Sequence, residues 1–352
     1  MCGVAGIIRP SFSPAEFQFV LTGMLSRIAH RGPDESGIYT GEGVGLGSVR
    51  LSIIDVATGQ QPMCTRDKHL WIVFNGEIFN YPELRDELIK KGHSFRTSSD
   101  TEVLLHLYQD YGPSCLQFLN GQFVFAVWDN HKKELFIARD RIGIRPLFYN
   151  VQNGNLVFAS EIKAILEYPD YTPDYDKAAL AEVFTFWTSV APRNIFQGIQ
   201  ELPPGHLMKF KNGQTEITSY WQIPFGADSS VKSFSDSVEK LDYLLEDAVK
   251  MRLRADVPVA AYLSGGLDSS VTTSYIRKFV PDQLQTFSIG FPNQNMMRPP
   301  TSMKSPGFCK PATRRLPVMR KTLLKFSLPS FGIPKPHLPA QLRLPCICSR
   351  GK

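Results

Sequence analysis

The second residue of the chain is a cysteine that could act as a nucleophile. Cys2 follows Met1 in the opening Met-Cys-Gly-Val-Ala-Gly-Ile, so removal of the initiator methionine would place a thiol and a free α-amine on one residue. An α-amine with a pKa of about 7.7 to 8.0 can accept the proton of a thiol with a pKa of about 8.5 near neutral pH. Acyl transfer would then need no His or Asp. Taken alone, this position favours the simpler interpretation of a small residue that begins a strand, and only the motifs that follow reverse that preference.

Four motifs follow Cys2 and carry groups that could bind an amino acid. They are HRGPD at residues 30–34, SVRLSIID at 48–55, FNGEIFNY at 74–81 and SSDTE at 98–102. In this order behind Cys2 they resemble the class II glutamine amidotransferases, and the resemblance covers essentially all of residues 1–210. It implies an N-terminal-nucleophile fold, which is an αββα sandwich, and hydrolysis of glutamine as the reaction. Residues 31–34 suit mainly a shaped loop.

The residue types in these motifs match the groups of glutamine. Arg50 can hold the α-carboxylate through a two-pronged contact, and Glu77 and Asp100 can hold the ammonium. The resemblance implies that the Asn75 side chain and the Gly76 amide stabilise the oxyanion that forms when the cysteine attacks. Simpler interpretations stay open, because Asn-Gly is a common hairpin turn, Arg50 could be a surface charge on a strand, and Asp100 suits a helix N-cap.

The elements expected to position these residues are short strands and two helices. The strand runs are residues 3–8, 70–74, 123–128, 134–138 and 156–160, and the helices are residues 82–91 and 101–111. Glycines alternate from Gly41 to Gly47, which misses the spacing of a dinucleotide fingerprint and suits a strand of small residues. Amphipathic helices that pack on sheets predict a layered α/β fold for residues 2–210.

A second domain is expected after a linker at residues 211–235, which is rich in Gly, Ser and Asp from Pro224 to Ser233. Residues 237–252 have helical spacing, and residues 257–263 form a continuous apolar run. A helix at 269–280 and a second buried strand at 286–291 follow. This order predicts that residues 236–291 open a doubly wound parallel α/β domain.

The turn between the first strand and helix of that domain carries the sequence YLSGGLDSS at residues 262–270. It resembles the pyrophosphate-binding loop of ATP pyrophosphatases, and behind an amidotransferase domain it identifies the asparagine synthetase (glutamine-hydrolysing) family. The resemblance implies ATP and Mg²⁺ as cofactors. It assigns the phosphates to Ser264, Gly265, Gly266 and Ser269, the metal to Asp268, and the flanks of the adenine to Leu253 and Ile289.

The implied reaction converts ATP, L-aspartate, L-glutamine and water into AMP, diphosphate, L-asparagine and L-glutamate. The partners are therefore small molecules, and the resemblance allows a homodimer. Two alternatives stay open. A related enzyme could amidate another carboxylate in peptide or polysaccharide biosynthesis, or the chain could be a non-catalytic module.

The last 61 residues break the pattern. Residues 292–352 hold eleven prolines and twelve Lys or Arg but no Asp or Glu, and they show no sustained period. We expect a disordered tail, with an out-of-frame end favoured over a natural basic tail. The second metal motif and the aspartate-binding residues of the family are missing after Phe291. This chain is therefore expected to hydrolyse glutamine at most.

Charge and hydropathy exclude other classes of protein. The formal charge is +6, so removing the +12 of residues 292–352 leaves about −6 on residues 1–291, which does not favour nucleic acid. No apolar run approaches the roughly 18 residues that span a bilayer, and no leader precedes the fold. The six cysteines are too scattered for a disulfide framework. We therefore expect a cytoplasmic protein without a membrane partner.

Overall fold

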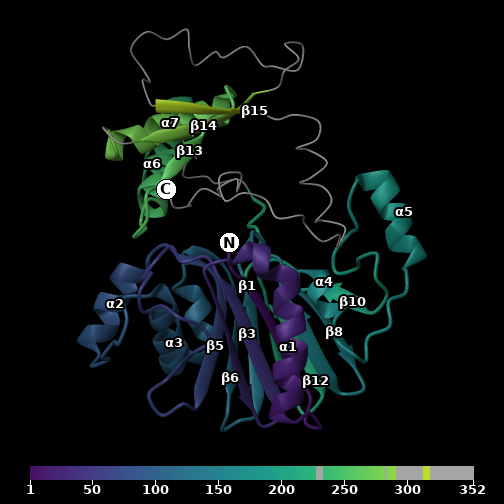
Figure 1. The fold of residues 1–352 in the computed structure, drawn as a ribbon. Helices are drawn as coiled ribbons and strands as arrows, with labels where there is room; N and C mark the ends of the chain where they lie inside the picture. Colours follow the sequence, from purple (N-terminus) through teal and green to yellow (C-terminus); the bar gives the residue numbers. More distant parts are fainter. Residues whose placement is uncertain (227–232, 282–283, 291–311, 318–352) are drawn as a thin grey trace. The chain divides into compact units, whose positions relative to one another are not determined.

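The computed structural model describes residues 1–226, 233–281, 284–290 and 312–317. The chain divides into two compact units, Met1–Pro224 and Phe225–Lys352 (Figure 1). The strands of the first unit are β1 (Gly3–Ile8), β2 (Glu35–Gly41), β3 (Val44–Arg50), β4 (Met63–Cys64), β5 (Leu70–Ile78), β6 (Gly121–Asp129), β7 (Glu134–Arg139), β8 (Phe148–Gln152), β9 (Asn155–Ala159), β10 (Ile199–Glu201), β11 (His206–Lys211) and β12 (Gln214–Ser219). Its α-helices are α1 (Pro14–Ile28), α2 (Tyr81–Lys90), α3 (Asp100–Tyr111), α4 (Ile162–Ile165) and α5 (Lys177–Phe186), and the short 3₁₀ helices are η1 (Ala29–Arg31) and η2 (Gly112–Gln117).

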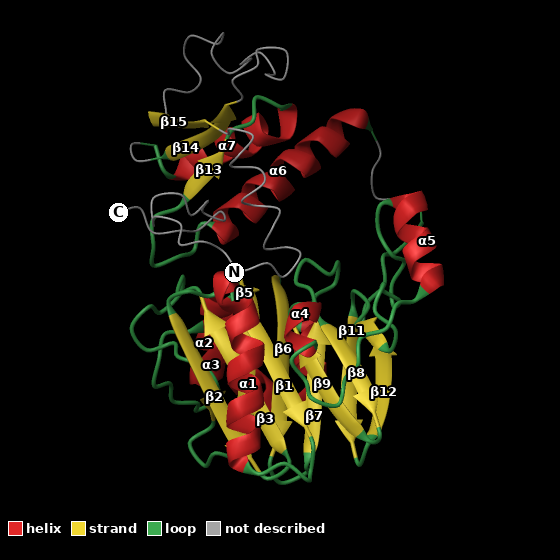
Figure 2. Cartoon of the chain, turned by 45° about the vertical axis from the view of Figure 1, so that its right-hand side comes forward, coloured by secondary structure: helices red, strands yellow, loops and turns green. Residues whose placement is uncertain are grey.

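Two six-stranded sheets form the centre of the first unit (Figure 2). One has the order β10-β8-β9-β1-β3-β2 and the other the order β12-β11-β7-β6-β5-β4. The pairs within both sheets are antiparallel. In an antiparallel sheet successive side chains point to opposite faces, so each strand contributes to two layers of packing.

Strand β1 shows how the layers are built. Val4 and Ile8 belong to a core that combines side chains of both sheets, whereas Ala5 and Ile7 pack with buried residues of α1 on the opposite face. A third core packs α2 and α3 against the outer face of the second sheet. The order of layers is helix, sheet, sheet, helix, so the expected αββα sandwich is confirmed.

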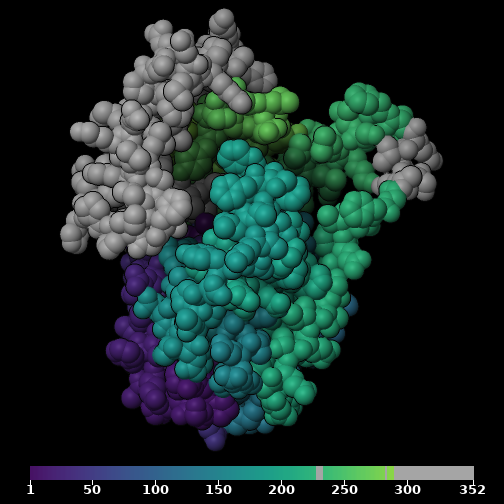
Figure 3. All heavy atoms as spheres, turned by 90° about the vertical axis from the view of Figure 1, so that its right-hand side faces the viewer, coloured from purple at the N-terminus to yellow at the C-terminus, as the bar shows by residue number. Residues whose placement is uncertain are grey.

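Helix α1 was not expected, although its start carries clear signals. Ser13 caps the helix in a capping box with Glu16, and Pro14 stands in the first turn. Helix α5 lies outside the four layers in the ribbon views, and Figure 3 faces the side of the unit on which it lies. Phe184 in α5 and Trp187 after it are 83% and 94% exposed. Helix α5 therefore adds little to the core.

Several expected boundaries differ from the observed ones. Strand β5 continues to Ile78, past the 70–74 run, and Ser99 rather than Asp100 is the N-cap of α3. Strand β12 lies inside the range expected to be a linker, because it completes the second sheet beside β11. The glycines that alternate from Gly41 to Gly47 do not lie in a single strand: Gly41 ends β2, Gly43 lies in the turn with a φ of +72°, and only Gly45 and Gly47 lie in β3.

The second unit contains α6 (Phe234–Arg252), β13 (Ala260–Tyr262), α7 (Leu267–Phe279), β14 (Gln285–Gly290) and β15 (Ala312–Pro317). The strands pair in parallel in the order β13-β14-β15. The expected strand, helix and strand are therefore present, around a small core of Ala261, Ile276 and Leu284.

The expectation that nothing after Phe291 would join this sheet is wrong for β15. Backbone hydrogen bonding to β14 does not need a periodic apolar pattern, which is the signal that residues 312–317 lack. The rest of the tail that we expected to be disordered, residues 292–311 and 318–352, lies outside the described residues. Among the helices of the described residues, none combines the length and apolarity of a membrane span.

Candidate active site

Cys2 lies directly before β1, where this strand meets the end of β3. Gly3 pairs with Val49, and the Leu51 N–H donates a hydrogen bond to Cys2 Sγ at 3.4 Å. The carbonyl of Cys2 accepts a hydrogen bond from Arg31 Nε at 2.9 Å. Backbone pairing and one arginine thus fix the position of the sulfur.

The charge state of Cys2 depends on opposing effects. Burial raises the pKa of the thiol, whereas the hydrogen bond from Leu51 and the positive charges of the amino terminus, Arg50 and Arg145 lower it. The amino terminus is that of Met1 in this structure. Removal of Met1 would bring the α-amine one residue closer to the sulfur.

Arg50 is the last residue of β3, and its side chain is only 6% exposed. Nη1 donates to Glu35 at 3.1 Å, and Nη2 donates to the carbonyls of Ile54 and Asp55 at 2.8 and 2.7 Å. A Cβ at Gly59 would lie 2.4 Å from Nη2, so the loop closes tightly on the guanidinium. Three of the five N–H groups are used, which leaves two for a substrate carboxylate. Arg50 is not a surface charge.

Asn75 lies inside β5 and is fully buried. It pairs with Val124 of β6, so the Asn75-Gly76 sequence forms part of a strand and not a turn. Both polar atoms of its side-chain amide are buried without a hydrogen-bond partner in the described residues. A Cβ at Gly76 would lie 2.2 Å from the backbone oxygen of Gln122, so only glycine fits there. An unpaired buried donor is the feature that an oxyanion site requires.

The Gly76 N–H points to the open edge of β5. The N–H groups of Phe74 and Ile78 lie on that edge, where they donate to Gln61 Oε1 at 2.7 Å and to Asp100 Oδ2 at 3.1 Å. Alternate residues of a strand present their N–H groups to the same side, so Gly76 lies between two side-chain acceptors. Strand β4 pairs with β5 only at residues 71 and 72 and does not cover this position.

Asp100 is the first residue of α3 and is 5% exposed. Burial and, to a smaller extent, the nearby charge of Glu77 raise the pKa of its carboxyl group to about 7, against the opposing effects of the Ile78 N–H and Arg50. The carboxyl group of Glu77 therefore lies close enough to disfavour the ionisation of Asp100. A ligand ammonium placed near both would remove this penalty.

Side chains of both sheets meet at this end of the sandwich. Arg50 on the first sheet acts electrostatically on Cys2 and on Asp100, and Arg145 acts on both Cys2 and Glu77. The expected residues of the glutaminase site are thus close in space although they come from separate strands. The arrangement combines a thiol, an unpaired amide, a buried guanidinium and two carboxyl groups.

In the second unit, the loop between β13 and α7 is closed by its own serines. Ser269 Oγ accepts a hydrogen bond from the Ser264 N–H at 3.2 Å, and Ser264 Oγ accepts one from the Gly266 N–H at 3.3 Å. Gly265 has a φ of +79°, in the region that favours glycine. Gly266 is the N-cap of α7 and provides no side-chain cap, so the start of this helix can face an anion.

The residues of this loop fit the phosphates of ATP, which would supply the activating group for a carboxylate. Asp268 is exposed in the first turn of α7. Within the described part of the chain no three acidic, His or Cys side chains gather in a way that could hold a metal ion. Leu253 is the C-cap of α6 and packs on the small core, and Ile289 lies on β14.

Comparison with protein families decides what the first unit is. The family described as a glutamine amidotransferase domain matches residues 1–221, which is more than half of the chain. This chain belongs to the glutamine amidotransferase family. In the second unit of this amidotransferase, residues 240–303 match the asparagine synthase family. The resemblance seen in the motifs is therefore confirmed.

Several relatives of this amidotransferase carry names that describe an activity. Asparagine synthetase [glutamine-hydrolyzing] 3 of Bacillus subtilis (strain 168) is 39% identical over 83% of this chain and 48% of the relative. A putative asparagine synthetase [glutamine-hydrolyzing] 2 of Methanocaldococcus jannaschii is 36% identical over 83% and 60%. Amidase chyE of Penicillium rubens is 36% identical over 76% and 42%. The chain thus spans about half the length of such relatives.

Solved structures with a related arrangement have low sequence identity. An allosteric regulatory enzyme of purine biosynthesis is 19% identical with a TM-score of 0.46, over 78% of this chain and 63% of that one. A glutamine phosphoribosylpyrophosphate amidotransferase from B. subtilis is 18% identical with a TM-score of 0.45, over 86% and 70%. The fold assignment depends on the sheets and layers described above and not on these likenesses.

Sequence reasoning missed three side chains of the amidotransferase site. Arg31 belongs to a motif that we interpreted as a loop, yet it binds Cys2 and also Glu161 at 2.9 Å. The side chain of Gln61 accepts a hydrogen bond from the Phe74 N–H at the edge of β5, and no motif in the sequence predicts this role. Arg145 lies in the loop before β8, and no signal in the sequence distinguishes this buried arginine from the exposed Arg141 of the same loop.

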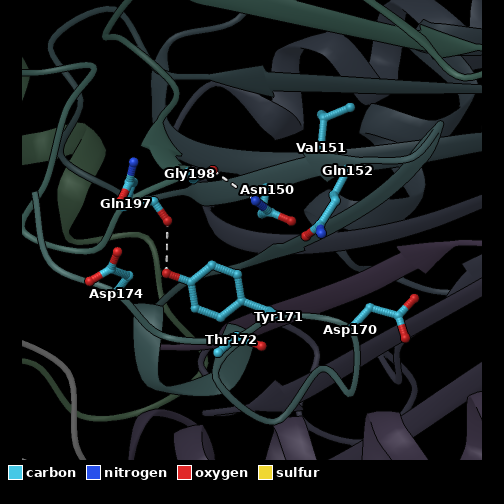
Figure 4. A pocket seen from close by; sticks show the side chains of 9 residues that line it. All are labelled: Asn150, Val151, Gln152, Asp170, Tyr171, Thr172, Asp174, Gln197 and Gly198. Carbon is cyan, nitrogen blue, oxygen red and sulfur yellow. Dashed lines mark hydrogen bonds between the residues drawn. The ribbon is translucent and has the colours of Figure 1, made fainter.

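The hollow shown in Figure 4 lies elsewhere in the first unit. It measures about 330 Å³, and its lining residues are Asn150, Val151, Gln152, Asp170, Tyr171, Thr172, Asp174, Gln197 and Gly198. The Asn150 side chain donates to Gly198, and its other amide atom is buried away from solvent. Asp170 pairs with Arg9. The hollow includes none of the residues gathered around Cys2.

Proposed function

We propose that the first unit hydrolyses glutamine to glutamate and ammonia with Cys2 as the nucleophile. The observation that carries the proposal is the unpaired Asn75 amide beside the open Gly76 N–H, at the end of the sandwich that holds Cys2. An unpaired buried amide costs stability unless a ligand uses it. Membership of the glutamine amidotransferase family supports the same conclusion.

The groups of the site divide the work as follows. Arg50 holds the substrate carboxylate with its two remaining N–H groups, and Glu77 with Asp100 holds the ammonium. The Cys2 sulfur attacks the side-chain amide carbon, and Asn75 and Gly76 donate to the resulting oxyanion. The C–N bond then breaks, and the nitrogen leaves as ammonia with the proton taken from the thiol. Water hydrolyses the thioester and releases glutamate.

The fate of the ammonia is part of the proposal. We propose that the whole protein is an asparagine synthetase that uses ATP and Mg²⁺ to activate the side-chain carboxylate of aspartate. The support comes from the match of residues 240–303 to the asparagine synthase family and from the loop at residues 264–269. Because the chain spans about half of its relatives, this polypeptide is expected to retain only glutamine hydrolysis.

Glutamate release from the full chain tests the glutaminase proposal. Cys2→Ala should abolish release, whereas Cys64→Ala, which removes another half-buried thiol, should leave it unchanged. Equal release from Cys2→Ala and the parent chain would refute the role of Cys2. An absence of release from a parent chain that lacks Met1 would favour a non-catalytic module.

Diphosphate release tests the acceptor separately. With ATP and Mg²⁺ present, the expected result is no release that depends on aspartate, because only part of the synthetase family is present. Aspartate-dependent release would show that the chain is complete enough for synthesis. Diphosphate release with a different carboxylate would instead favour another acceptor. One relative is named as an amidase and not as an asparagine synthetase, which is the reason to test other carboxylates.

A further inference from the structure

Glu161 is an acidic residue beside the candidate site that the proposed reaction does not use. It is the N-cap of α4, yet its side chain makes no capping hydrogen bond to that helix. Its Oε1 instead accepts a hydrogen bond from Arg31 Nη1 at 2.9 Å and lies 2.9 Å from His30 Nε2, while Lys163 Nζ lies 2.8 Å from Oε2. Burial opposes ionisation of this carboxyl group, but the three basic partners outweigh it and lower the pKa to about 2.

The backbone next to Glu161 is fixed to strand β1. Ser160 follows β9 and is fully buried. Its N–H donates to the Val4 carbonyl at 2.9 Å, and its Oγ accepts a hydrogen bond from the Val4 N–H at 2.9 Å. Val4 is two residues from Cys2 in the chain. The carboxylate of Glu161 is therefore anchored at a set place relative to the start of β1.

Arg31 connects this carboxylate to Cys2 through two direct contacts. Its Nε donates to the Cys2 carbonyl at 2.9 Å, and its Nη1 donates to Glu161 at 2.9 Å. The side chain of Arg31 is only 8% exposed, and a guanidinium keeps its charge at physiological pH, so it needs a negative partner. Among the ion pairs of the described residues, the carboxylate that Arg31 contacts is that of Glu161.

The contact at the Cys2 carbonyl gains importance once Met1 is removed, because Cys2 would then have a peptide bond on one side only. Arg31 fixes the plane of the peptide that follows Cys2, and the Leu51 N–H donates to the sulfur at 3.4 Å. Together the two contacts set the torsion between the carbonyl and the side chain of Cys2. Without Glu161, Arg31 would lose the contact that fixes its other end.

We propose that Glu161 is a positioning residue that acts through Arg31 to hold Cys2 in the orientation for attack. Its effect on the rate rests on the proposed function, whereas its hold on Cys2 does not. The loss of Glu161 should slow turnover and leave glutamine binding intact, because the groups assigned to the carboxylate and the ammonium of glutamine belong to other side chains.

Steady-state glutamate release from the full chain tests this role. Glu161→Gln should lower kcat by about 10- to 100-fold, the scale expected when a reacting atom is misplaced by about 1 Å, with an unchanged KM for glutamine. Glu167→Gln is the matched control and should change neither value, because Glu167 is another half-buried carboxylate that pairs with an arginine, Arg27 at 2.6 Å. An unchanged kcat in Glu161→Gln, an equal loss in Glu167→Gln, or a raised KM at constant kcat would overturn the proposal.

A double-mutant cycle shows whether Glu161 acts through Arg31. Arg31→Met should lower kcat at least as much as Glu161→Gln does, and the two changes combined should lower it no further than Arg31→Met alone. Losses that multiply would contradict the proposal, because Glu161 would then act by another route. Glu161→Asp keeps the charge but has a shorter reach, so it should also lower kcat, and it takes the place of Glu161→Gln in the cycle if that variant does not fold.

Amide exchange followed by NMR measures the hold on Cys2 without glutamine. In Glu161→Gln the Leu51 N–H should exchange with solvent deuterium about tenfold faster than in the parent chain, whereas amides inside β3 should not change. Equal exchange of the Leu51 N–H in both chains would refute the inference. A faster exchange in Glu161→Gln, together with a parent chain that releases no glutamate, would refute the proposed function and support the hold of Glu161 on Cys2.

Discussion

Asp100 should make glutamine binding depend on pH in the neutral range. Its pKa of about 7 in the empty site means that about one carboxyl in eleven is ionised at pH 6 and about ten in eleven at pH 8. Only the ionised form pairs with the substrate ammonium. The dissociation constant for glutamine should therefore rise about tenfold from pH 8 to pH 6, which corresponds to about 1.4 kcal/mol.

Isothermal titration calorimetry of Cys2→Ala measures this binding without turnover. The same titration of Cys2→Ala combined with Asp100→Asn should give weak binding that hardly changes between pH 6 and pH 8. Asparagine keeps an acceptor for the Ile78 N–H, so the loop should stay in place. Equal dissociation constants for Cys2→Ala at the two pH values would refute the reasoning. So would a tenfold change that persists in the double variant, because another group would then be responsible.

The same shift has a consequence for stability. The folded pKa of Asp100 lies above its ordinary value of 3.8, so the empty protein binds this proton more tightly when folded. Its contribution to stability is complete below about pH 4 and is lost as the pH rises through about 7. At pH 8 without glutamine, Asp100→Asn should therefore melt at a higher temperature than the parent chain, and the difference should vanish toward pH 4.

Three further substitutions separate function from stability. Asn75→Leu should lower kcat by about 10²- to 10³-fold, because it removes a donor to the oxyanion. The melting temperature should not fall, because the replaced amide has no partner in the empty site. A large drop in melting temperature would contradict this. Gly76→Ala should destabilise the fold by about 1–3 kcal/mol through its contact with Gln122, measured by chemical denaturation against Gly226→Ala, where no atom lies within 4 Å. Arg50→Lys should raise the KM for glutamine by about 30-fold, the equivalent of about 2 kcal/mol, and an unchanged KM would remove Arg50 from the carboxylate site.

Local patterns predicted most of the strands that carry the site. The apolar run predicted for β1 has the same bounds as the observed strand. The runs predicted for β6 and β7 agree with the observed strands to within a few residues at each end. Both faces of these three strands are largely buried, which gives continuous apolar runs. Helix α1 was missed although its capping box is readable. Strands β8 and β10 to β12 were missed because their patterns are short and partly exposed, and pairing with neighbours decides them.

The identity of the motif residues could be read from the sequence, but their chemical state could not. Asn75-Gly76 is a turn signal by local preference, and pairing with β6 overrides that preference. The raised pKa of Asp100 depends on burial and on Glu77, which lies 23 positions away in the chain. The use of Arg50 N–H groups by Ile54 and Asp55 depends on how the following loop closes. These properties arise only once the sandwich is assembled.

The buried polar groups without hydrogen-bond partners show where the first unit loses free energy of unfolding. Arg31, Asn75 and Arg145 are three of the five described residues with buried unpaired side-chain atoms, and electrostatic or direct contacts tie Arg31 and Arg145 to Cys2. Buried polar atoms without partners cost free energy, and two of the residues that carry them act on the same sulfur. A glutamine molecule that becomes an oxyanion would supply the acceptor that Asn75 lacks. In the proposed reaction, the groups that lack partners in the empty site would gain them in the transition state, which is where binding energy accelerates a reaction.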